Sequence, residues 1–356
     1  MGGAMSDVDT SRERLQRIKV IGVGGGGSNA VRRMMEENIE DIEFITINTS
    51  LKEMSTSRAA ANLQIGGQIT HGLSTGGDVG LGSKAADAAR GEIAQLLDKT
   101  DMLFIATTLG GGTGTGAAPI VAELARERGI LTVAVVTKPF SFEGNRRMQT
   151  AEAGLKELVQ HVDAEIVISN DRLLSLEARD LKLTDAFALA DEMLKKAIQI
   201  VCDFVLKVGL INVDLRDVTE ILTNGGRTMV SMTSAKGPDR ALQAAEEAIT
   251  SPLLDITLKG ATGLLLNIEG GDLSIGEVHG AADLIARTAA ADANIIWGYV
   301  DNPELADEIH ITLIATGYQL DEQGNPYTDR DSPIEADLDN RPFDTLDLDI
   351  PTQMRR

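Results

Sequence analysis

Two stretches of glycine could hold phosphate groups by their backbone alone. The first, GVGGGGSN, spans residues 22–29, and the second, LGGGTGTGAAP, spans residues 109–119. Because glycine has no Cβ, successive N–H groups can turn toward one point and a ligand can approach closely. A helix N-terminus behind such a stretch adds partial positive charge. The sequence therefore predicts two phosphate-binding loops, to which Thr113 and Thr115 add hydroxyl donors.

A second group of residues could act on water. Asn212, Asp214 and Asp217 form the pattern N-x-D-x-x-D. Carboxylates close to a water molecule can orient it and accept its proton, as in-line attack on a γ-phosphate requires. The same spacing also suits an aspartate that caps the following helix. The pattern by itself leaves both interpretations open.

The elements around the glycines alternate between strand and helix. Apolar, β-branched runs at 18–23, 42–50, 101–108, 130–139 and 164–171 predict strands. A helix is expected from about Ser28, which suits an N-cap, and another over 118–128, with Pro119 in its first turn and Gly129 past its end. This alternation predicts an α/β fold with a mainly parallel sheet, whose ligands lie at the carboxyl ends of the strands. Both glycine stretches fall there.

A long helical pattern follows, from Thr184 as the expected cap to about Val208. Its apolar face holds Phe187, Leu194, Ile198, Val201 and Val205. Beyond it, a second α/β region is expected, with strands at 263–270, 293–300 and 309–318 and a helix near 238–250. From about Gln319 the apolar pattern stops, which is typical of a disordered acidic tail that ends in a mixed apolar and basic peptide.

Composition excludes several classes of partner. The net charge of −21 opposes binding to nucleic acid or to an anionic lipid surface, so we expect neither nucleic-acid binding nor direct membrane insertion. No run of apolar residues is long enough to span a bilayer, and the first residues lack a secretory core. The single cysteine, Cys202, fits a reducing cytosol and is expected to be packed in the core.

Other nucleotide-binding patterns fit the glycines less well. Gly22, Gly24 and Gly27 match the dinucleotide pattern G-x-G-x-x-G, which would suit an NAD-dependent oxidoreductase, but the next strand ends in Asn48, Thr49 and Ser50 rather than in an acid. No Gly-Lys pair for a P-loop occurs. Glycines that merely allow tight packing of strand-to-helix turns remain an alternative. Two loops at separate strand ends favour one polyphosphate held from two sides.

Several motifs, in order, resemble the tubulin and FtsZ superfamily, and the FtsZ family of bacterial-type cell-division proteins in particular. GGGTGTG at 110–116 is similar to the superfamily's signature loop, and IGVGGGGSNAV to its first phosphate loop. TKPFSFEGNRR, ISNDRLL, TDAFALAD and GLINVDLRDV resemble later family segments, the last being the catalytic synergy loop. The similarity covers residues 18–318, and LDIPTQMRR resembles the tail peptide that binds membrane anchors.

The resemblance implies a fold, domain boundaries and ligands. It implies a Rossmann-type GTP-binding domain over 18–183, a central helix over 184–208 and a synergy-loop domain over 209–318. These are flanked by a disordered extension (1–17), an acidic linker (319–343) and a partner-binding peptide (344–356). GTP or GDP is the implied ligand, with Mg²⁺ expected beside GTP and no separate metal site. The implied phosphate-side residues are Gly24, Gly25, Gly26, Asn29, Gly111, Gly112, Thr113, Gly114, Thr115 and Gly116.

Five further residues carry over to the sugar and base. Glu143 and Arg147 match positions on the ribose side, and Asn170, Phe187 and Asp191 match positions at the guanine. A carboxylate or an amide can recognise the guanine N1 and N2 donors, and Phe187 offers a stacking face. Without the resemblance, Glu143 and Arg147 could be a surface pair at helical spacing, and Phe187 could belong to the core.

The length of the central helix indicates which nucleotide the acids could act on. If Phe187 and Asp191 contact the base, Asp214 lies about 35 Å further on by helix rise. Catalytic acids at that distance must serve a nucleotide held by another subunit, and such a head-to-tail contact grows into a filament. The resemblance implies a cytoplasmic GTPase that polymerises, forms the cytokinetic ring under the membrane and hydrolyses GTP at subunit junctions.

The chain also departs from the family pattern. Ser50 stands where an Asp is usual, the glycine-rich loop at 71–82 has altered residues, and Gln353 replaces an aromatic residue in the tail peptide. These changes keep open a second hypothesis, a structural paralogue that binds GTP with little turnover.

Overall fold

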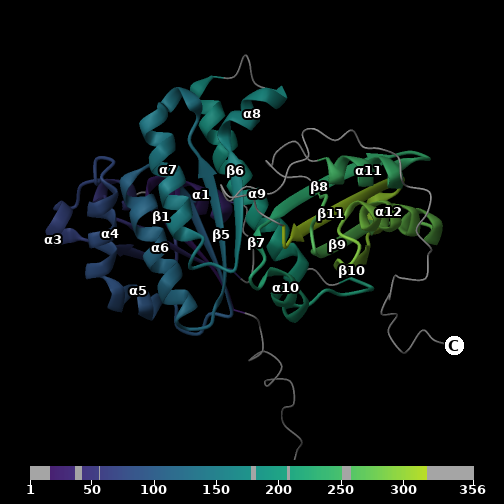
Figure 1. Ribbon diagram of the computed structural model, residues 1–356, viewed down its shortest axis with the longest axis horizontal. Helices are drawn as coiled ribbons and strands as arrows, with labels where there is room; N and C mark the ends of the chain where they lie inside the picture. Colours follow the sequence, from purple (N-terminus) through teal and green to yellow (C-terminus); the bar gives the residue numbers. More distant parts are fainter. Residues whose placement is uncertain are drawn as a thin grey trace, which may run out of the picture.

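The computed structural model describes residues 17–36, 42–55, 57–177, 182–206, 209–250 and 258–318. Two α/β units lie side by side, with helix α9 (Leu183–Leu206) between them (Figure 1). The expected linker at 319–343 and peptide at 344–356, and all but one residue of the expected 1–17 extension, lie outside the described residues.

The first unit is built on a parallel sheet of seven described strands. Their order is β3-β2-β1-β4-β5-β6-β7, and every neighbouring pair is parallel. The order reverses between β1 and β4, which is the switch point where open α/β sheets bind ligands. The strands are β1 Ile18–Val23, β2 Ile42–Asn48, β3 Ala61–Gln64, β4 Met102–Thr108, β5 Leu131–Lys138, β6 Ala164–Ser169 and β7 Gly226–Arg227.

Helices cover both faces of this sheet, so its central strands are apolar on both sides. Along β1, Val20 belongs to the cluster with α1 and α9, whereas Ile21 belongs to the cluster with α6 on the opposite face. The helices of this unit are α1 Gly24–Glu36, α2 Leu51–Met54, α3 Gly67–Thr70, α4 Val79–Ala88, α5 Arg90–Leu96, α6 Gly112–Arg126, η2 Ser141–Glu143, α7 Asn145–Leu158 and α8 Asn170–Glu177.

The two helices that follow the glycine stretches begin earlier than predicted. α1 begins at Gly24 rather than near Ser28, and α6 begins at Gly112, so that Pro119 lies inside α6 and not in its first turn. Glycine is a poor helix former, but here tertiary packing overrides propensity, because most of these glycines are pressed against neighbouring backbone. The glycines therefore form the helix N-termini themselves.

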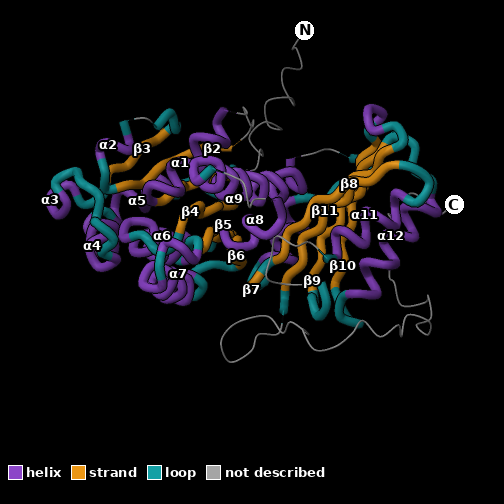
Figure 2. Tube along the Cα trace, turned by 90° about the horizontal axis from the view of Figure 1, so that it is seen from above, coloured by secondary structure: helices purple, strands orange, loops and turns teal. Residues whose placement is uncertain are grey.

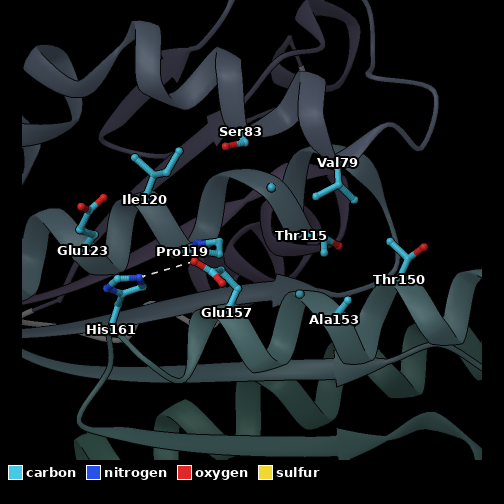
Figure 3. A pocket seen from close by; sticks show the side chains of 12 residues that line it. Val79, Ser83, Thr115, Pro119, Ile120, Glu123, Thr150, Ala153, Glu157 and His161 are labelled. Atoms are coloured by element: carbon cyan, nitrogen blue, oxygen red, sulfur yellow. Dashed lines mark ion pairs between the residues drawn. The ribbon is translucent and has the colours of Figure 1, made fainter.

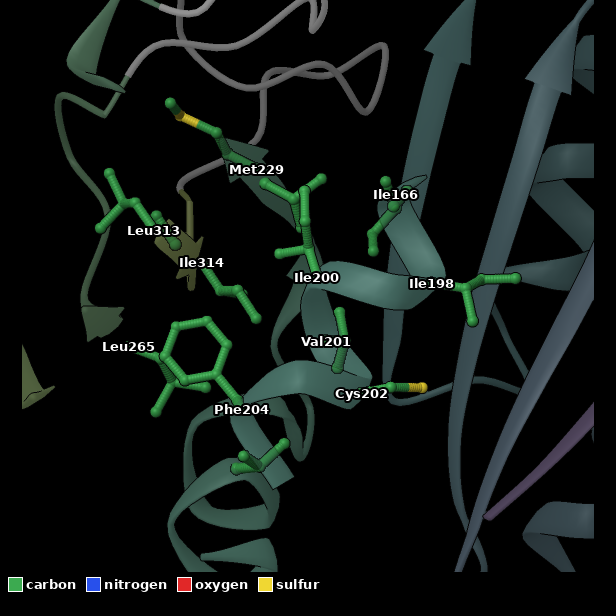
Figure 4. Packing of buried hydrophobic residues seen from close by; sticks show 14 of the residues in the cluster. Ile166, Ile198, Ile200, Val201, Cys202, Phe204, Met229, Leu265, Leu313 and Ile314 are labelled. Atoms are coloured by element: carbon green, nitrogen blue, oxygen red, sulfur yellow. The ribbon is translucent and has the colours of Figure 1, made fainter. Parts of the chain in front are cut away.

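Helix α9 packs into both units. Leu194, Ile198 and Val201 are buried as predicted, and Val205 is partly buried. Phe187 is 41% exposed, and Thr184 is a helical residue beside Asp185 rather than the cap. In Figure 4 Phe204 points toward the second sheet, whereas Ile198 and Cys202 point to the opposite side, and one hydrophobic cluster includes all three. Cys202 is fully buried, as expected.

The second unit is a mixed four-stranded sheet, with two of its helices on the face turned away from α9 (Figure 2). Its order is β10-β9-β11-β8, with β10 parallel to β9 and the other pairs antiparallel. The three predicted strands are present. Strand β8 and helix α12 were not predicted; β8 contains polar residues along a half-exposed surface. The elements are α10 Leu215–Leu222, β8 Met229–Lys236, α11 Arg240–Ile249, β9 Gly263–Gly270, α12 Ile275–Thr288, β10 Asn294–Asp301, η3 Pro303–Leu305 and β11 Glu308–Thr316.

Candidate nucleotide site and acid loop

The two glycine stretches meet at the switch point of the parallel sheet. They follow β1 and β4, which pair directly, with Val23 opposite Thr107. Gly24 has a φ of +72°, and a Cβ placed on it would lie 2.8 Å from the backbone N of Gly114. The N-termini of α1 and α6 therefore lie beside each other, and their unpaired N–H groups make one region that favours an anion.

The packing and phosphate interpretations of the glycines apply to different residues. A Cβ on Gly112 would overlap the Thr75 side chain, one on Gly114 that of Thr107, and one on Gly116 the carbonyl of Val79. By contrast, a Cβ on Gly111 would meet no other atom within 4 Å. Close packing thus accounts for three of the glycines in the second stretch, while Gly111, at the N-cap of α6, faces open space.

In the first stretch, a Cβ on any of the four helical glycines would meet another atom at less than 3.0 Å. A Cβ on Gly27 would overlap the carbonyl oxygen of Ala106, and one on Gly26 would overlap the hydroxyl of Thr108. Gly25 is partly exposed beside the Glu53 carboxylate, and Asn29 is exposed in the second turn of α1. Gly24, Gly25 and Gly26 therefore lie at the strand end, and Asn29 lies on the helix surface behind them.

The two predicted threonines are buried within the loop's own network. The Thr113 hydroxyl lies 3.0 Å from that of Thr49 and 3.4 Å from that of Thr75. The Thr115 hydroxyl accepts a hydrogen bond of 2.9 Å from the N–H of Gly110. In the described structure these hydroxyls hold the loop in shape, and the donors that face outward are backbone groups.

The predicted sugar-side residues form an ion pair. Arg147 Nε lies 3.1 Å from Glu143 Oε2, and Glu143 Oε1 accepts a hydrogen bond of 2.8 Å from the N–H of Phe140. The Glu143 side chain is only 10% exposed, whereas that of Arg147 is 45% exposed. The pair thus ties α7 to η2 beside Gly110, whose Cβ would press on Arg147.

Three aromatic rings gather beside this pair. Phe140 stacks on Phe142 with centroids 4.9 Å apart, and Phe187 meets Phe140 edge-on at 5.4 Å. Phe140 is buried, but Phe142 is 55% exposed and Phe187 keeps an exposed face. The sequence identified Phe187 but not Phe140 or Phe142. The contact of Phe187 with these two rings joins segments more than 40 residues apart and leaves no local pattern.

The two polar residues assigned to the base differ in their surroundings. Asn170 is 2% exposed, and its Oδ1 has no hydrogen-bond partner among the residues that the structure describes. Asp191 instead pairs with Arg33 of α1, with Nε and Oδ2 3.3 Å apart. Burial raises the pKa of the Asp191 carboxyl, and the charge of Arg33 opposes that shift. Asn170 therefore offers a buried acceptor to a ligand, whereas Asp191 already has a partner.

These features fit a purine nucleotide. The buried orphan acceptor of Asn170, the exposed faces of Phe142 and Phe187, and the open backbone at Gly111 offer contacts for a base and for phosphates. When bound, GTP would place its triphosphate at this cradle, and Gly24, Gly111 and Asn170 are the residues best placed to hold the nucleotide.

Ser50, where the family pattern has an acid, has a structural task. Its side chain caps the short helix α2 by accepting from the N–H of Glu53 at 3.4 Å. Glu53 in turn accepts from Asn48 at 2.8 Å. A carboxylate therefore stands close to Gly25 even though position 50 does not supply one.

The three residues of the acid loop lie together at the other end of α9. Asp214 is the N-cap of α10, and its Oδ1 accepts from the N–H groups of Arg216 (2.7 Å) and Asp217 (3.1 Å). Asp217 Oδ2 accepts from the N–H of Asp214 at 2.8 Å, which completes a capping box. Asn212 Oδ1 accepts from the N–H of Gly209 at 2.5 Å. The capping interpretation is thus correct, and each of these residues still keeps a second oxygen or its amide group near solvent.

The loop is fixed to the second sheet. Leu210 and Ile211 both donate backbone hydrogen bonds to the carbonyl of Tyr299 in β10, at 2.8 and 3.2 Å. Helix α9 has 24 residues and so spans about 36 Å between this loop and the base side of the candidate site. The structure therefore separates the acids from the nucleotide residues of the same chain.

Comparisons with known proteins agree with this architecture. The model of the Tubulin/FtsZ family GTPase domain matches residues 17–177, and that of the FtsZ family C-terminal domain matches residues 226–319. An FtsZ mutant from M. jannaschii is 37% identical, with a TM-score of 0.80, over 87% of this chain and 93% of that one. An empty FtsZ dimer from the same organism is 38% identical (TM-score 0.79), over 88% and 93%. A GTPγS-bound protofilament of CetZ2 from Haloferax volcanii, at 18% identity and a TM-score of 0.73 over 86% and 95%, shares the fold.

The chain belongs to the tubulin/FtsZ family of GTPases. The predicted α/β fold, with its parallel sheet and second mixed-sheet unit, is confirmed. No helix among the described residues is long and apolar enough to cross a bilayer.

Proposed function

We propose that this chain is a GTPase that assembles head-to-tail into filaments and hydrolyses GTP only at the junction between two subunits. One observation carries the proposal: the nucleotide residues and the acid loop lie at opposite ends of α9, about 36 Å apart. The description of an FtsZ relative as a dimer and of a CetZ relative as a protofilament supports self-association.

At such a junction the two halves would complement each other. The N-termini of α1 and α6 stabilise the phosphates, while Asn170 and the Phe142–Phe187 face hold the guanine. Asp214 and Asp217 of the neighbouring subunit orient the attacking water and accept its proton through the oxygens that face solvent. Their capping bonds hold these carboxylates in place before a neighbour arrives. Mg²⁺ would neutralise part of the phosphate charge.

The biological role that we propose is the cytokinetic ring. Filaments would form in the cytoplasm under the membrane at the division site, and residues 344–356 would bind a membrane-anchoring division protein. The support for this role is the family membership and the resemblance of LDIPTQMRR to the FtsZ tail peptide.

The test is phosphate release from GTP, measured per molecule over a range of protein concentrations beside light scattering with GTP and with GDP. Turnover per molecule should rise steeply above a threshold concentration, and scattering should rise with it. If a dilute, monomeric sample hydrolyses GTP at the full rate, the junction site does not exist.

Asp214→Asn isolates the carboxylate from the cap, because asparagine caps a helix about as well as aspartate. The variant should keep its stability and its GTP affinity but lose most turnover, and its filaments should persist longer. Asp292→Asn, which removes an exposed acid elsewhere in the same unit, is the matched control and should hydrolyse GTP normally.

A second hypothesis is a filament-forming paralogue that binds GTP with little turnover. It is favoured by the structural tasks already held by Ser50, Asp214 and Asp217, all of which cap helices. Filaments that form with GTP and release no phosphate would select this hypothesis. An NAD-dependent oxidoreductase loses its support, because the family match accounts for the same glycines.

A further inference from the structure

A pocket of about 510 Å³ lies behind the phosphate loop, between helices α4, α6 and α7. Its volume falls within the range of about 300–1,000 Å³ that small-molecule sites occupy. Val79, Pro119, Ile120 and Ala153 supply apolar surface along the length of the pocket (Figure 3). Neither the glycine cradle nor the acid loop needs this cavity.

The ionisable groups of the pocket gather at one end. Figure 3 shows Glu123, Glu157 and His161 together there, whereas Thr115 and Thr150 lie toward the other end. His161 Nε2 is 3.9 Å from Glu157 Oε1. The pocket thus has apolar surface and a few hydroxyl groups along its length and ends in carboxylates.

The charges at that end favour a cation. Arg90 pairs with both Glu123 and Asp87, so these three groups leave one net negative charge. Glu157, 60% exposed, adds a second. Within the described part of the chain, the residues that line the pocket include no lysine or arginine. The apolar part of a ligand would fill the pocket, and its protonated amine would neutralise the carboxylates.

We propose that this pocket binds a small, largely apolar molecule that carries a protonated amine. The site is independent of the proposed GTPase function, since its walls are the sides of three helices. Its effect on nucleotide binding rests on that function.

The wall that the pocket shares with the phosphate loop provides the coupling. Thr115 and Gly116 line the pocket and belong to the first turns of α6, which begin the glycine cradle. Pro119 has no N–H and cannot donate to the carbonyl of Thr115 four residues earlier, so this turn is held by fewer helical hydrogen bonds. A ligand against Pro119 and Thr115 therefore bears directly on the position of the α6 N-terminus. Because coupling between two sites is reciprocal, GTP should change the affinity for the amine by the same factor.

The experiment titrates naphthylethylamine, naphthylethanol and naphthylacetate into the full-length chain by calorimetry. Methyl NMR of Val79 and Ile120 locates the binding. The amine should bind about three- to tenfold more tightly than the alcohol, as two partly exposed carboxylates allow, and the acetate should bind most weakly. Equal affinities for the three probes, or shifts that avoid Val79 and Ile120, overturn the proposal.

Two variants and one control sharpen the test. Ala153→Phe places a ring into the pocket from an exposed helix position and should abolish binding of the amine. Glu157→Gln should reduce the preference for the amine over the alcohol by about threefold. Glu152→Gln changes an exposed acid on the same helix outside the pocket and should change nothing. If Ala153→Phe binds the amine as the parent does, the site is elsewhere.

The coupling is tested by GTP affinity with and without saturating naphthylethylamine. An amine that binds at Val79 and Ile120 yet leaves GTP affinity unchanged overturns the coupling and keeps the site. A chain that binds the amine but no GTP overturns the proposed function instead.

Discussion

The two halves of the candidate site are built by opposite means. The cradle at the ends of β1 and β4 consists mainly of glycine backbone pressed against other backbone, and most of it is buried. The acid loop at 212–217 consists of side chains at the surface, held by short-range caps. One half depends on packing across the sheet, whereas the other is a local structure that a few residues define. The comparison predicts that substitutions in the cradle damage the fold, and that those in the loop mainly damage chemistry.

The largest expected effect is that of Gly27→Ala. The added methyl would overlap the carbonyl of Ala106 and press on the backbone of Gly22, neither of which can yield without moving β1 or β4. We expect the free energy of unfolding to fall by about 2–3 kcal/mol, measured by urea denaturation. Gly111→Ala is the control, since its methyl meets open space; it should change stability by less than about 0.5 kcal/mol while it weakens GTP binding. Equal losses in the two variants would contradict the division between packing and open glycines.

A pH effect is expected where the two units join. Glu165 of β6 and Arg227 of β7 form a buried ion pair with Nε and Oε1 3.6 Å apart. Burial raises the pKa of Glu165 to about 7, although Arg227 opposes the shift. Between the ordinary carboxyl pKa and 7, the folded chain holds a proton that the unfolded chain has released, so stability should fall as pH rises through this window. The slope from one proton is at most about 1.4 kcal/mol per pH unit.

Urea midpoints of the parent chain and of Glu165→Gln, measured from pH 5 to pH 8, check this expectation. The variant should lose the decline that Glu165 causes, whatever its absolute stability. An identical pH dependence in the two chains would show that Glu165 does not titrate in this range.

A smaller effect separates the cap from the carboxylate. Asp214→Ala removes both hydrogen bonds that the side chain accepts, and should cost about 1 kcal/mol in thermal or urea unfolding. Asp214→Asn should cost close to nothing. If the two variants are equally destabilised, the charge of Asp214 and not its capping bond stabilises α10.

The smallest effect is an absence of reaction. Cys202 is fully buried on α9, and burial raises the pKa of its thiol, so the reactive thiolate is scarce and shielded. Iodoacetamide should not label Cys202 in the folded chain and should label it readily in urea. Mass spectrometry measures the extent of labelling. Rapid labelling of the native chain would show that the core shared by the two units opens.

Much of the architecture could be predicted because its signals are local. Strands β1, β4 and β5 are largely apolar runs, and the period of α9 places Leu194, Ile198 and Val201 on one face. Strand β8 was missed because Ser231 is buried and Met232 is exposed, so its sequence lacks the apolar–polar alternation that indicates a strand. The starts of α1 and α6 were predicted too late, because glycine has a low helix propensity. The helical glycines of α6 are explained by the packing of this helix on α4 and β4.

The same distinction between local signals and long-range contacts applies to the candidate site. Its glycines and acids could be recognised from sequence patterns and the family resemblance. The edge-on contacts of Phe187 with Phe140 and Phe142, and the pairing of Asp191 with Arg33, join segments far apart in the chain, and the orphan oxygen of Asn170 leaves no local pattern. The capping role of Asp214 was one of two interpretations of a local pattern, and the geometry shows that it can coexist with the other.

Helix α9 has apolar residues committed to the cores of both units, so neither its tilt nor its length can vary without breaking a single continuous cluster. Helix α9 therefore sets a fixed distance between its two ends. In a head-to-tail polymer, the length of α9 would largely set the axial repeat. Every junction along the filament would then have the same spacing. A filament whose repeat changed while α9 remained intact would have to bend at its junctions, where, in the proposed assembly, the acids of one subunit would meet the phosphates of the next.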